Sequence, residues 1–97
     1  MDLLIIHQAE EELWNAVAYY EEQQSGLGLE FEAEVRSAFN AILTNPKLWP
    51  LQSGNFRKHI LPRFPYSIWY EVTSELIRII AIAHQKRKPG FWKGRKT

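Results

Sequence analysis

The sequence predicts an α+β fold in the order β-α-α-β-β-β, with a helical hairpin packed on one face of a mostly antiparallel four-stranded sheet. Two observations carry this prediction. Apolar residues recur at helical spacing twice in the first half of the chain, and apolar and polar residues alternate along strand-length segments in the second half. The length of 97 residues, with 45% hydrophobic and 24% charged side chains, fits a single domain over residues 1–97.

The N-terminal part of the chain combines a short strand with an amphipathic helix. Residues 2–6, DLLII, form an apolar run of strand length. From Ala9 to Tyr20, apolar side chains recur at steps of three and four residues, which places them along one stripe of a helix. Gly26 can adopt the left-handed conformation that ends helices, so we expect the first helix to stop there.

A second amphipathic helix is expected after Gly28. Its apolar stripe runs from Phe31 to Ile42, and Pro46 ends it, because proline disfavours the helical conformation of the preceding residue. The short connection SGLG makes the two helices an antiparallel hairpin. Since two helices alone leave apolar area exposed, we expect their stripes to cover a sheet.

Three further strands are expected in the second half of the chain, after a loop over residues 45–55. Residues 56–61 alternate modestly, and residues 66–72 alternate clearly, with Trp69 on the face opposite the apolar set. Residues 76–84 are apolar at nearly every position, as in a central strand that is covered on both faces. The helices cover one face of this sheet, so the other face is left for basic residues.

The composition excludes several kinds of site. The chain has no cysteine, which excludes disulfides and thiolate metal sites and favours a reducing cytoplasm. Its histidines, at positions 7, 59 and 84, lack the spacing of metal ligands, and we expect no cofactor. No apolar run approaches the roughly 18 residues that suggest a membrane span, and the N-terminus does not read as a signal peptide. We therefore expect a cytoplasmic protein without a membrane partner.

Charge is divided unevenly along the chain. Residues 1–48 hold nine acidic and two basic side chains, whereas residues 49–97 hold two acidic and ten basic ones. Such asymmetry suggests a polyanion or an acidic partner for the basic half. The alternative is that the two halves neutralise each other inside one fold. Charge alone leaves both interpretations open.

Four segments resemble the RelE/ParE superfamily, the toxins of bacterial type II toxin–antitoxin pairs. They are residues 12–35, residues 41–50 (AILTNPKLWP), residues 63–72 (RFPYSIWYEV) and residues 81–95 (AIAHQKRKPGFWKGR). The pattern FPY-x-I-x-Y, followed after the last strand by H-x-x-R-x-P-x-x-W-x-x-R, is the specific part of this resemblance. It implies the same fold as the periodicity, and a partner antitoxin whose C-terminal segment wraps the toxin.

The resemblance also implies one of two activities, since RelE-like members cleave messenger RNA on the ribosome and ParE-like members poison DNA gyrase. Cleavage through the ribose 2′-OH needs a proton acceptor, cations for the charged phosphorane and a proton donor. RelE-like toxins meet these needs with Lys and Arg and a C-terminal Tyr or His. The candidates here are Arg57, Arg63, Arg87 and His84.

A missing residue favours the ParE-like activity. No tyrosine follows Tyr70, and Trp92 stands about where a ribonuclease relative would keep one. An indole N–H cannot deliver a proton at useful pH, so we expect binding to gyrase rather than RNA cleavage. The expected target-binding residues are Lys86, Arg87, Lys88, Trp92 and Arg95.

Other expectations concern the antitoxin and the end of the chain. We expect the antitoxin to contact Trp69, Glu21 and Glu22. Phe91 and Trp92 are expected to anchor the chain against the sheet, leaving residues 93–97 as a loose tail. A further alternative is a binding module without toxicity, retained for its antitoxin or for DNA.

Overall fold

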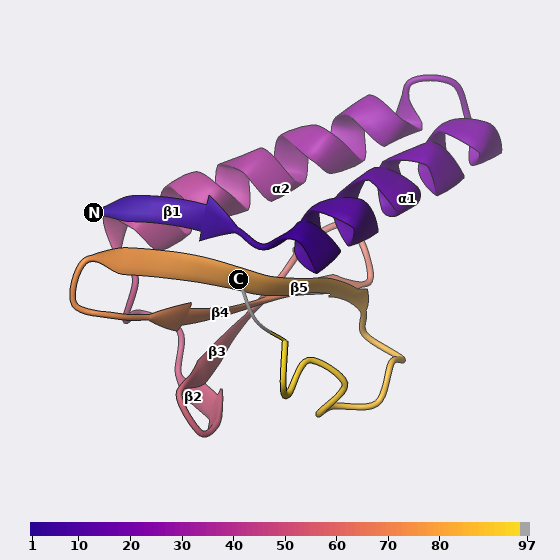
Figure 1. Ribbon diagram of the computed structural model, residues 1–97. Coiled ribbons are helices and arrows are strands. Elements are labelled where there is room, and N and C mark those ends of the chain that lie inside the picture. Colours follow the sequence, from indigo (N-terminus) through magenta and orange to yellow (C-terminus); the bar gives the residue numbers. More distant parts are fainter. Residues whose placement is uncertain (96–97) are drawn as a thin grey trace.

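A five-stranded sheet and a helical hairpin make up the computed structural model, which describes residues 1–95 (Figure 1). The predicted α+β class is confirmed, with the two helices side by side over one face of the sheet. The elements, in chain order, are β1 (Asp2–Ile5), α1 (His7–Gln23), α2 (Leu27–Thr44), β2 (Leu51–Ser53), β3 (Phe56–Ile60), β4 (Tyr66–Val72) and β5 (Leu76–His84).

The strands lie in the order β1-β5-β4-β3-β2. β1 runs parallel to β5, and the other neighbours are antiparallel, which confirms a mostly antiparallel sheet. The connections fit this order. The helical hairpin that follows β1 carries the chain across the sheet, so β1 can lie parallel to β5, whereas short turns join the strands from β2 to β5 as antiparallel neighbours. β5 lies inside the sheet, in agreement with its nearly continuous apolar sequence.

The predicted number of four strands is wrong by one, because β2 lies in the segment expected to be a loop. Leu51 pairs with Arg57, and Ser53 pairs with Phe56, across a turn in which Gly54 has φ 56°. A strand of three residues is too short to show a period of two, so its sequence gives no strand signal. Pairing with β3 stabilises it instead.

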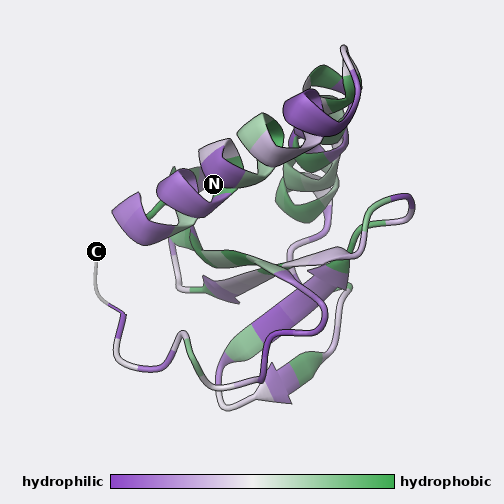
Figure 2. Ribbon diagram, turned by 90° about the vertical axis from the view of Figure 1, so that its right-hand side faces the viewer, coloured by the Kyte–Doolittle hydropathy of each residue, from purple (hydrophilic) through white to green (hydrophobic). Residues whose placement is uncertain are grey.

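The hydrophobic core lies between the hairpin and the sheet, and the hydrophobic stretches of the strands under the helices are visible in Figure 2. The two helices approach each other closely at Gly28, where a Cβ atom would lie 2.6 Å from the carbonyl oxygen of Val17. The buried core side chains of the helices are Ala9, Leu13, Ala16, Phe31, Val35, Ala38 and Ile42. They belong to the two apolar stripes predicted from the sequence.

β5 continues beyond the strand that pairs with it. Along the chain, the pairing of β1 with β5 ends at Ile5 and Ile79, after which the amide of Ile6 still donates to the carbonyl of Ile79 at 3.2 Å. The register between β4 and β5 shifts just beyond this point, where Trp69 is opposite Ala81 but Tyr70 is opposite Ile79. Within residues 1–95, this edge of β5 has no strand neighbour after Ile79. Other groups must therefore satisfy its backbone.

None of the helices in the described part of the chain is long and apolar enough to cross a membrane.

Candidate functional site

The chain after β5, residues 85–95, turns back along the sheet face that the helices leave open, and we call it the C-terminal segment (Figure 1). Trp92 stacks on Trp69 of β4, with ring centroids 3.8 Å apart and planes inclined by 24°. Phe91 lies edge-on to Trp92 at 5.1 Å. The expectation that Phe91 and Trp92 anchor this segment is confirmed.

Anchoring removes both tryptophans from the surface. Trp92 is 1% exposed, and Trp69 is 6% exposed beneath it. Trp69 does lie on the face opposite the helices, as expected, but the stacked indole covers it. In this fold, Trp92 is therefore not accessible as a target contact, and Trp69 is not accessible as an antitoxin contact, which corrects both expectations. Burying two large apolar rings against each other is favourable and leaves neither at the surface.

The carboxylate of Glu12, on α1, joins the C-terminal segment to the edge of β5. Its Oε2 atom accepts hydrogen bonds from Arg87 Nη1 at 3.0 Å and Arg95 Nη2 at 2.9 Å. Its Oε1 atom accepts from Arg95 Nη1 at 2.9 Å and from the backbone amide of Ile82 at 3.1 Å. Arg95 Nη1 also donates to the carbonyl of Ile80 at 3.0 Å. Glu12 and Arg95 thus satisfy the backbone that β1 leaves unpaired.

These contacts correct two expectations for the end of the chain. The side chain of Arg95 is 14% exposed and held by Glu12 and the sheet edge, so it is not part of a loose tail or an open target surface. Its guanidinium reaches groups that lie far away in sequence, which no local pattern reveals. The remainder of the predicted tail, residues 96–97, lies outside the described residues.

Phe91 packs between the two arginines that bind Glu12. The guanidinium carbon of Arg87 lies 3.8 Å from the centroid of the Phe91 ring, and that of Arg95 lies 5.1 Å from it. Cations over an aromatic face are attracted by its quadrupole, and the single negative charge of Glu12 offsets part of their positive charge. The segment is therefore held by apolar, cationic and backbone contacts at once.

Three lysines of the C-terminal segment remain at the surface. Lys86, Lys88 and Lys93 are exposed, and within residues 1–95 none of them forms an ion pair. Arg87 stays about half exposed while it bonds to Glu12. Of the five expected target-binding residues, the structure thus leaves Lys86, Arg87 and Lys88 accessible. They form a positively charged surface on an anchored segment.

Two of the residues expected to act in RNA cleavage, Arg57 and Arg63, instead hold parts of the fold together. Arg57 donates to the carbonyl of Trp49 at 2.6 Å and to that of Lys47 at 3.3 Å, which holds the loop before β2. Arg63, in the turn before β4, pairs with Glu30 of α2 at 2.7 Å. Neither lines the pocket that contains His84 and Arg87, so the structure does not bring the four candidates together.

His84 and Arg87 do share a pocket of about 320 Å³, lined also by Tyr19 and Tyr66. The imidazole packs against the Tyr66 ring at 5.4 Å, and its Nδ1 atom accepts a hydrogen bond from the amide of Lys86 at 3.1 Å. This contact places the proton of the neutral imidazole on Nε2. Burial raises the pKa of the Tyr66 hydroxyl above its usual value. The pocket thus brings an imidazole and a guanidinium together.

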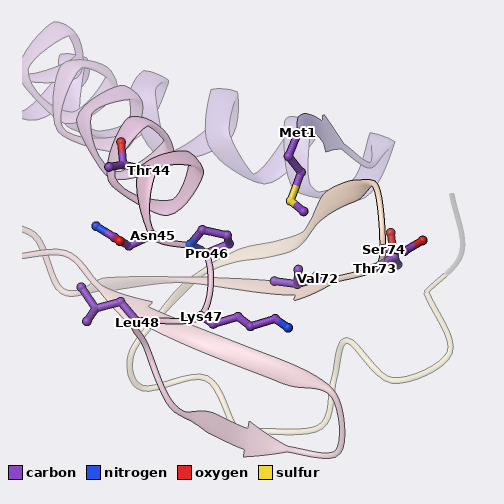
Figure 3. Close-up of a pocket in the computed structure, with 9 residues that line it drawn as sticks. All are labelled: Met1, Thr44, Asn45, Pro46, Lys47, Leu48, Val72, Thr73 and Ser74. Atoms are coloured by element: carbon purple, nitrogen blue, oxygen red, sulfur yellow. The ribbon is translucent and has the colours of Figure 1, made fainter.

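Another cavity, of about 490 Å³, lies where β4 ends and β5 begins (Figure 3). Lys47 is the one charged side chain among its described lining residues, and the other side chains around it are small, polar or aliphatic. Such a lining brings no pair of groups together for acid–base or nucleophilic chemistry. Among the described residues, no group of three or more His, Asp or Glu side chains could hold a metal ion.

The two glutamates expected to bind the antitoxin differ in their surroundings. Glu21 accepts hydrogen bonds from the amides of Gly26 at 2.8 Å and Gly28 at 3.0 Å, which are free donors at the start of α2. Its carboxylate therefore caps the start of α2, although Glu21 is itself exposed. Glu22 remains exposed.

Glu12 is the residue that sequence reasoning missed. It stands in the run Glu10-Glu11-Glu12, and no sequence pattern sets it apart from its two neighbours. Its position on the helix turn that faces β5 distinguishes it from Glu10 and Glu11, which are exposed. Because its partners follow it by 70 to 83 residues, no short motif contains them.

Comparison with known proteins identifies the family. A family model described as "ParE toxin of type II toxin-antitoxin system, parDE" matches residues 3–89. A solved structure, "Chromosomal ParDE TA system from P. aeruginosa", has the same fold, with a TM-score of 0.64 and 18% identity over 87% of this chain and 95% of that chain. A search of curated protein sequences found no match. The family match extends over most of the chain, and this chain therefore belongs to the ParE toxin family of type II toxin–antitoxin systems.

Proposed function

We propose that this ParE-family toxin inhibits DNA gyrase by binding to it and is kept silent by a cognate ParD antitoxin. The observation that carries the proposal is the C-terminal segment, where Trp92 and Arg95 are anchored while Lys86 and Lys88 stay exposed. An ordered cationic surface loses little conformational entropy on binding and attracts acidic partners over a distance. The proposed target also places the protein in the cytoplasm.

The arrangement of the other basic groups supports binding over bond chemistry. Arg57 is used to hold carbonyls, and Arg63 is paired with Glu30. A phosphorane would have to be stabilised by cations that converge on one point, and these two point to different parts of the fold. The absence of a tyrosine after Tyr70 removes a further proton donor.

The first experiment measures both activities of the induced toxin in cells. Plasmid supercoiling and messenger RNA 5′ ends are followed in parallel after induction. We expect supercoiling to be lost without new cuts within codons. New cuts with normal supercoiling would contradict the gyrase target, and the absence of any growth defect would favour a non-toxic binding module.

The second experiment tests the surface with purified gyrase. The double variant Lys86→Gln/Lys88→Gln removes two exposed charges that form no ion pair within the described residues. We expect it to need about tenfold or more additional toxin for the same inhibition, because charge complementarity raises association rates by at least that factor. Lys47→Gln/Lys93→Gln is a control with the same change in net charge and only one substitution in the segment. Equal inhibition by both variants would exclude residues 86 and 88 as the contact.

A second candidate function is a ribosome-dependent endoribonuclease, favoured by the pocket that joins His84, Tyr66 and Arg87. With Nδ1 occupied by the amide of Lys86, Nε2 of His84 is the atom that could exchange a proton with a substrate. His84→Ala is expected to abolish RNA cleavage if this function is the correct one. The same variant is expected to inhibit gyrase normally if the first proposal is correct.

A further inference from the structure

Both ends of the C-terminal segment meet at one carboxylate. Arg87 stands near its beginning and Arg95 at the end of the described chain, and both donate to Glu12. Glu12 belongs to α1, which is packed on the core through Ala9, Leu13 and Ala16. The carboxylate therefore links a surface segment to a fixed part of the molecule.

We propose that Glu12 is a positioning residue of this toxin, and that its carboxylate holds residues 85–95 in the arrangement that presents Lys86 and Lys88. The inference rests on the proposed function only in taking these lysines as the target contact. The role of Glu12 in holding the segment stands on the structure by itself. Glu12 does not need to touch the target, because it acts through Arg87 and Arg95.

The hydrogen bonds of Glu12 explain why we expect no other group to replace its carboxylate. The two oxygens together accept four hydrogen bonds, three from guanidinium groups and one from the amide of Ile82. The side chain is 17% exposed, so water has limited access to these bonds. Charge-assisted bonds in such surroundings are stronger than neutral ones, and a remaining unpaired charge is costly. Loss of the carboxylate leaves Arg95 beside the sheet edge without a counter-charge.

The second anchor cannot replace this one. Trp92 holds the middle of the segment through its contact with Trp69. It lies five residues after Arg87, beyond Pro89 and Gly90, and Gly90 has φ 100°. Rotation at such a glycine is easy, so a fixed Trp92 does not fix the residues before it. The amides of Gln85 and Lys86 bond to Pro65 and His84, and the Arg87–Glu12 contact is the one among the described residues that ties this part to α1.

The carboxylate also closes the edge of β5. In place of a strand, Arg95 donates a hydrogen bond to the carbonyl of Ile80, and the amide of Ile82 donates one to Glu12. An unpaired strand edge otherwise attracts other extended chains. The ordering of the segment and the protection of the edge thus depend on the same pair of side chains.

The test uses Glu12→Gln, which keeps the size and one acceptor oxygen but removes the charge. Limited trypsin digestion of the full-length toxin reports opening of the segment through cleavage after Lys86, Arg87 and Lys93, whereas the bond before Pro89 resists trypsin. We expect cleavage at these sites to become about tenfold faster, because removing one partner of a shielded charge pair frees the local structure. Glu11→Gln, a neighbour with the same chemistry and no contact with the segment, is the matched control.

Cleavage elsewhere separates local opening from unfolding. The bond after Arg36 lies inside α2, so it is cleaved only when that helix opens. Faster cleavage at the segment with unchanged cleavage after Arg36 supports the proposal. An unchanged rate at Lys86 and Arg87 overturns it. If Glu12→Gln unfolds the chain, the variant Arg95→Lys is digested instead, since it keeps the charge but loses the paired geometry. A rate of cleavage after Lys86 that rises only in proportion to the rate after Arg36 also overturns the proposal.

A gyrase assay on the same samples separates the two proposals. If the segment contacts gyrase, Glu12→Gln is expected to inhibit supercoiling about tenfold less well than Glu11→Gln. Faster digestion with unchanged inhibition removes the segment from the target contact but leaves Glu12 as its anchor. A wild-type protein without effect on gyrase refutes the proposed function, and the digestion experiment still decides the role of Glu12.

Discussion

Trp92 shows how one residue can read as a binding residue in sequence and serve as an anchor in the fold. It stands among six basic residues, which suggested an exposed contact for a partner. In the structure its side chain is the largest of those that are fully buried, stacked on Trp69 and near Phe56. The composition of the segment describes its exposed side chains, and Trp92 is the exception, a buried ring that anchors the middle of the segment to the sheet.

Replacing Trp92 with alanine is expected to lower the free energy of unfolding by about 3–5 kcal/mol, because the stacking contact is lost and a cavity forms. The measurement is urea denaturation followed by circular dichroism. Trp14→Ala is the matched control, since Trp14 is 48% exposed and its removal is expected to cost about 0.5 kcal/mol or less. Similar losses for the two variants would contradict the anchoring role of Trp92.

His59 makes the free energy of unfolding depend on pH. Its ring packs against Trp49 at 4.4 Å, and burial lowers the pKa of His59 below its usual value of 6.5. The unfolded chain therefore binds a proton more readily than the folded one. The contribution of His59 to stability is complete above pH 6.5 and is lost as the pH falls through the lower pKa of the folded state.

We expect His59→Gln to reduce the loss of stability between neutral pH and about pH 5, because the variant has no imidazole to protonate. Urea midpoints measured across this range compare it with the wild type. His7→Gln is the control, since His7 is exposed on the first turn of α1. An identical pH profile for the wild type and His59→Gln would refute the assignment.

At the scale of elements, the hairpin depends on a cap that lies outside the usual position. The N-cap residue of α2 is Gly26, which has no side chain to accept a hydrogen bond. Glu21, near the end of α1, supplies the acceptor for the amides of Gly26 and Gly28 instead. One carboxylate thus joins the end of one helix to the beginning of the next. The negative charge also suits the positive end of the α2 dipole.

Glu21→Ala is expected to lower the free energy of unfolding by about 0.5–2 kcal/mol, the usual range for loss of a helix cap. Glu22→Ala, one residue away and exposed, is expected to change stability little. Thermal unfolding of both variants makes the comparison. Equal stability would show that the cap contributes nothing.

The same pair of variants tests the antitoxin contact that remains from the sequence. Because Glu22 is free of the hairpin contacts, we expect Glu22→Ala to weaken capture of the co-expressed antitoxin more than Glu21→Ala does. The relevant measurement is the dissociation rate of the purified complex. An unchanged rate for Glu22→Ala would remove this helix end from the interface.

At the scale of the whole molecule, the acidic and basic halves of the chain partly neutralise each other. Arg63 pairs with Glu30, and both Arg87 and Arg95 pair with Glu12, so each of these pairs joins the second half to the first. Within residues 1–95, three basic side chains without an ion pair lie on the C-terminal segment, namely Lys86, Lys88 and Lys93. The two interpretations of the charge asymmetry are therefore compatible, with internal pairing for some residues and a free cationic surface for others.

This surface predicts how binding depends on salt. The association rate of the toxin with gyrase, its proposed target, is expected to fall steeply as ionic strength rises, because exposed charges are screened over about 10 Å at 0.1 M salt. Stopped-flow measurements at several salt concentrations give the slope, and Lys86→Gln/Lys88→Gln is expected to flatten it. A rate independent of salt would exclude steering by these lysines.

The sequence by itself determined the two helices, their inward stripes, four of the five strands and the anchoring of Phe91 and Trp92. These follow from local periodicity and from the cost of exposing large apolar side chains. Only the tertiary structure decided the parallel pairing of β1 with β5, the short strand β2, the capping role of Glu21 and the contacts of Glu12 with Arg87 and Arg95. Their partners become neighbours through the fold alone, since a carboxylate and a guanidinium more than 70 residues apart leave no periodic trace in the chain.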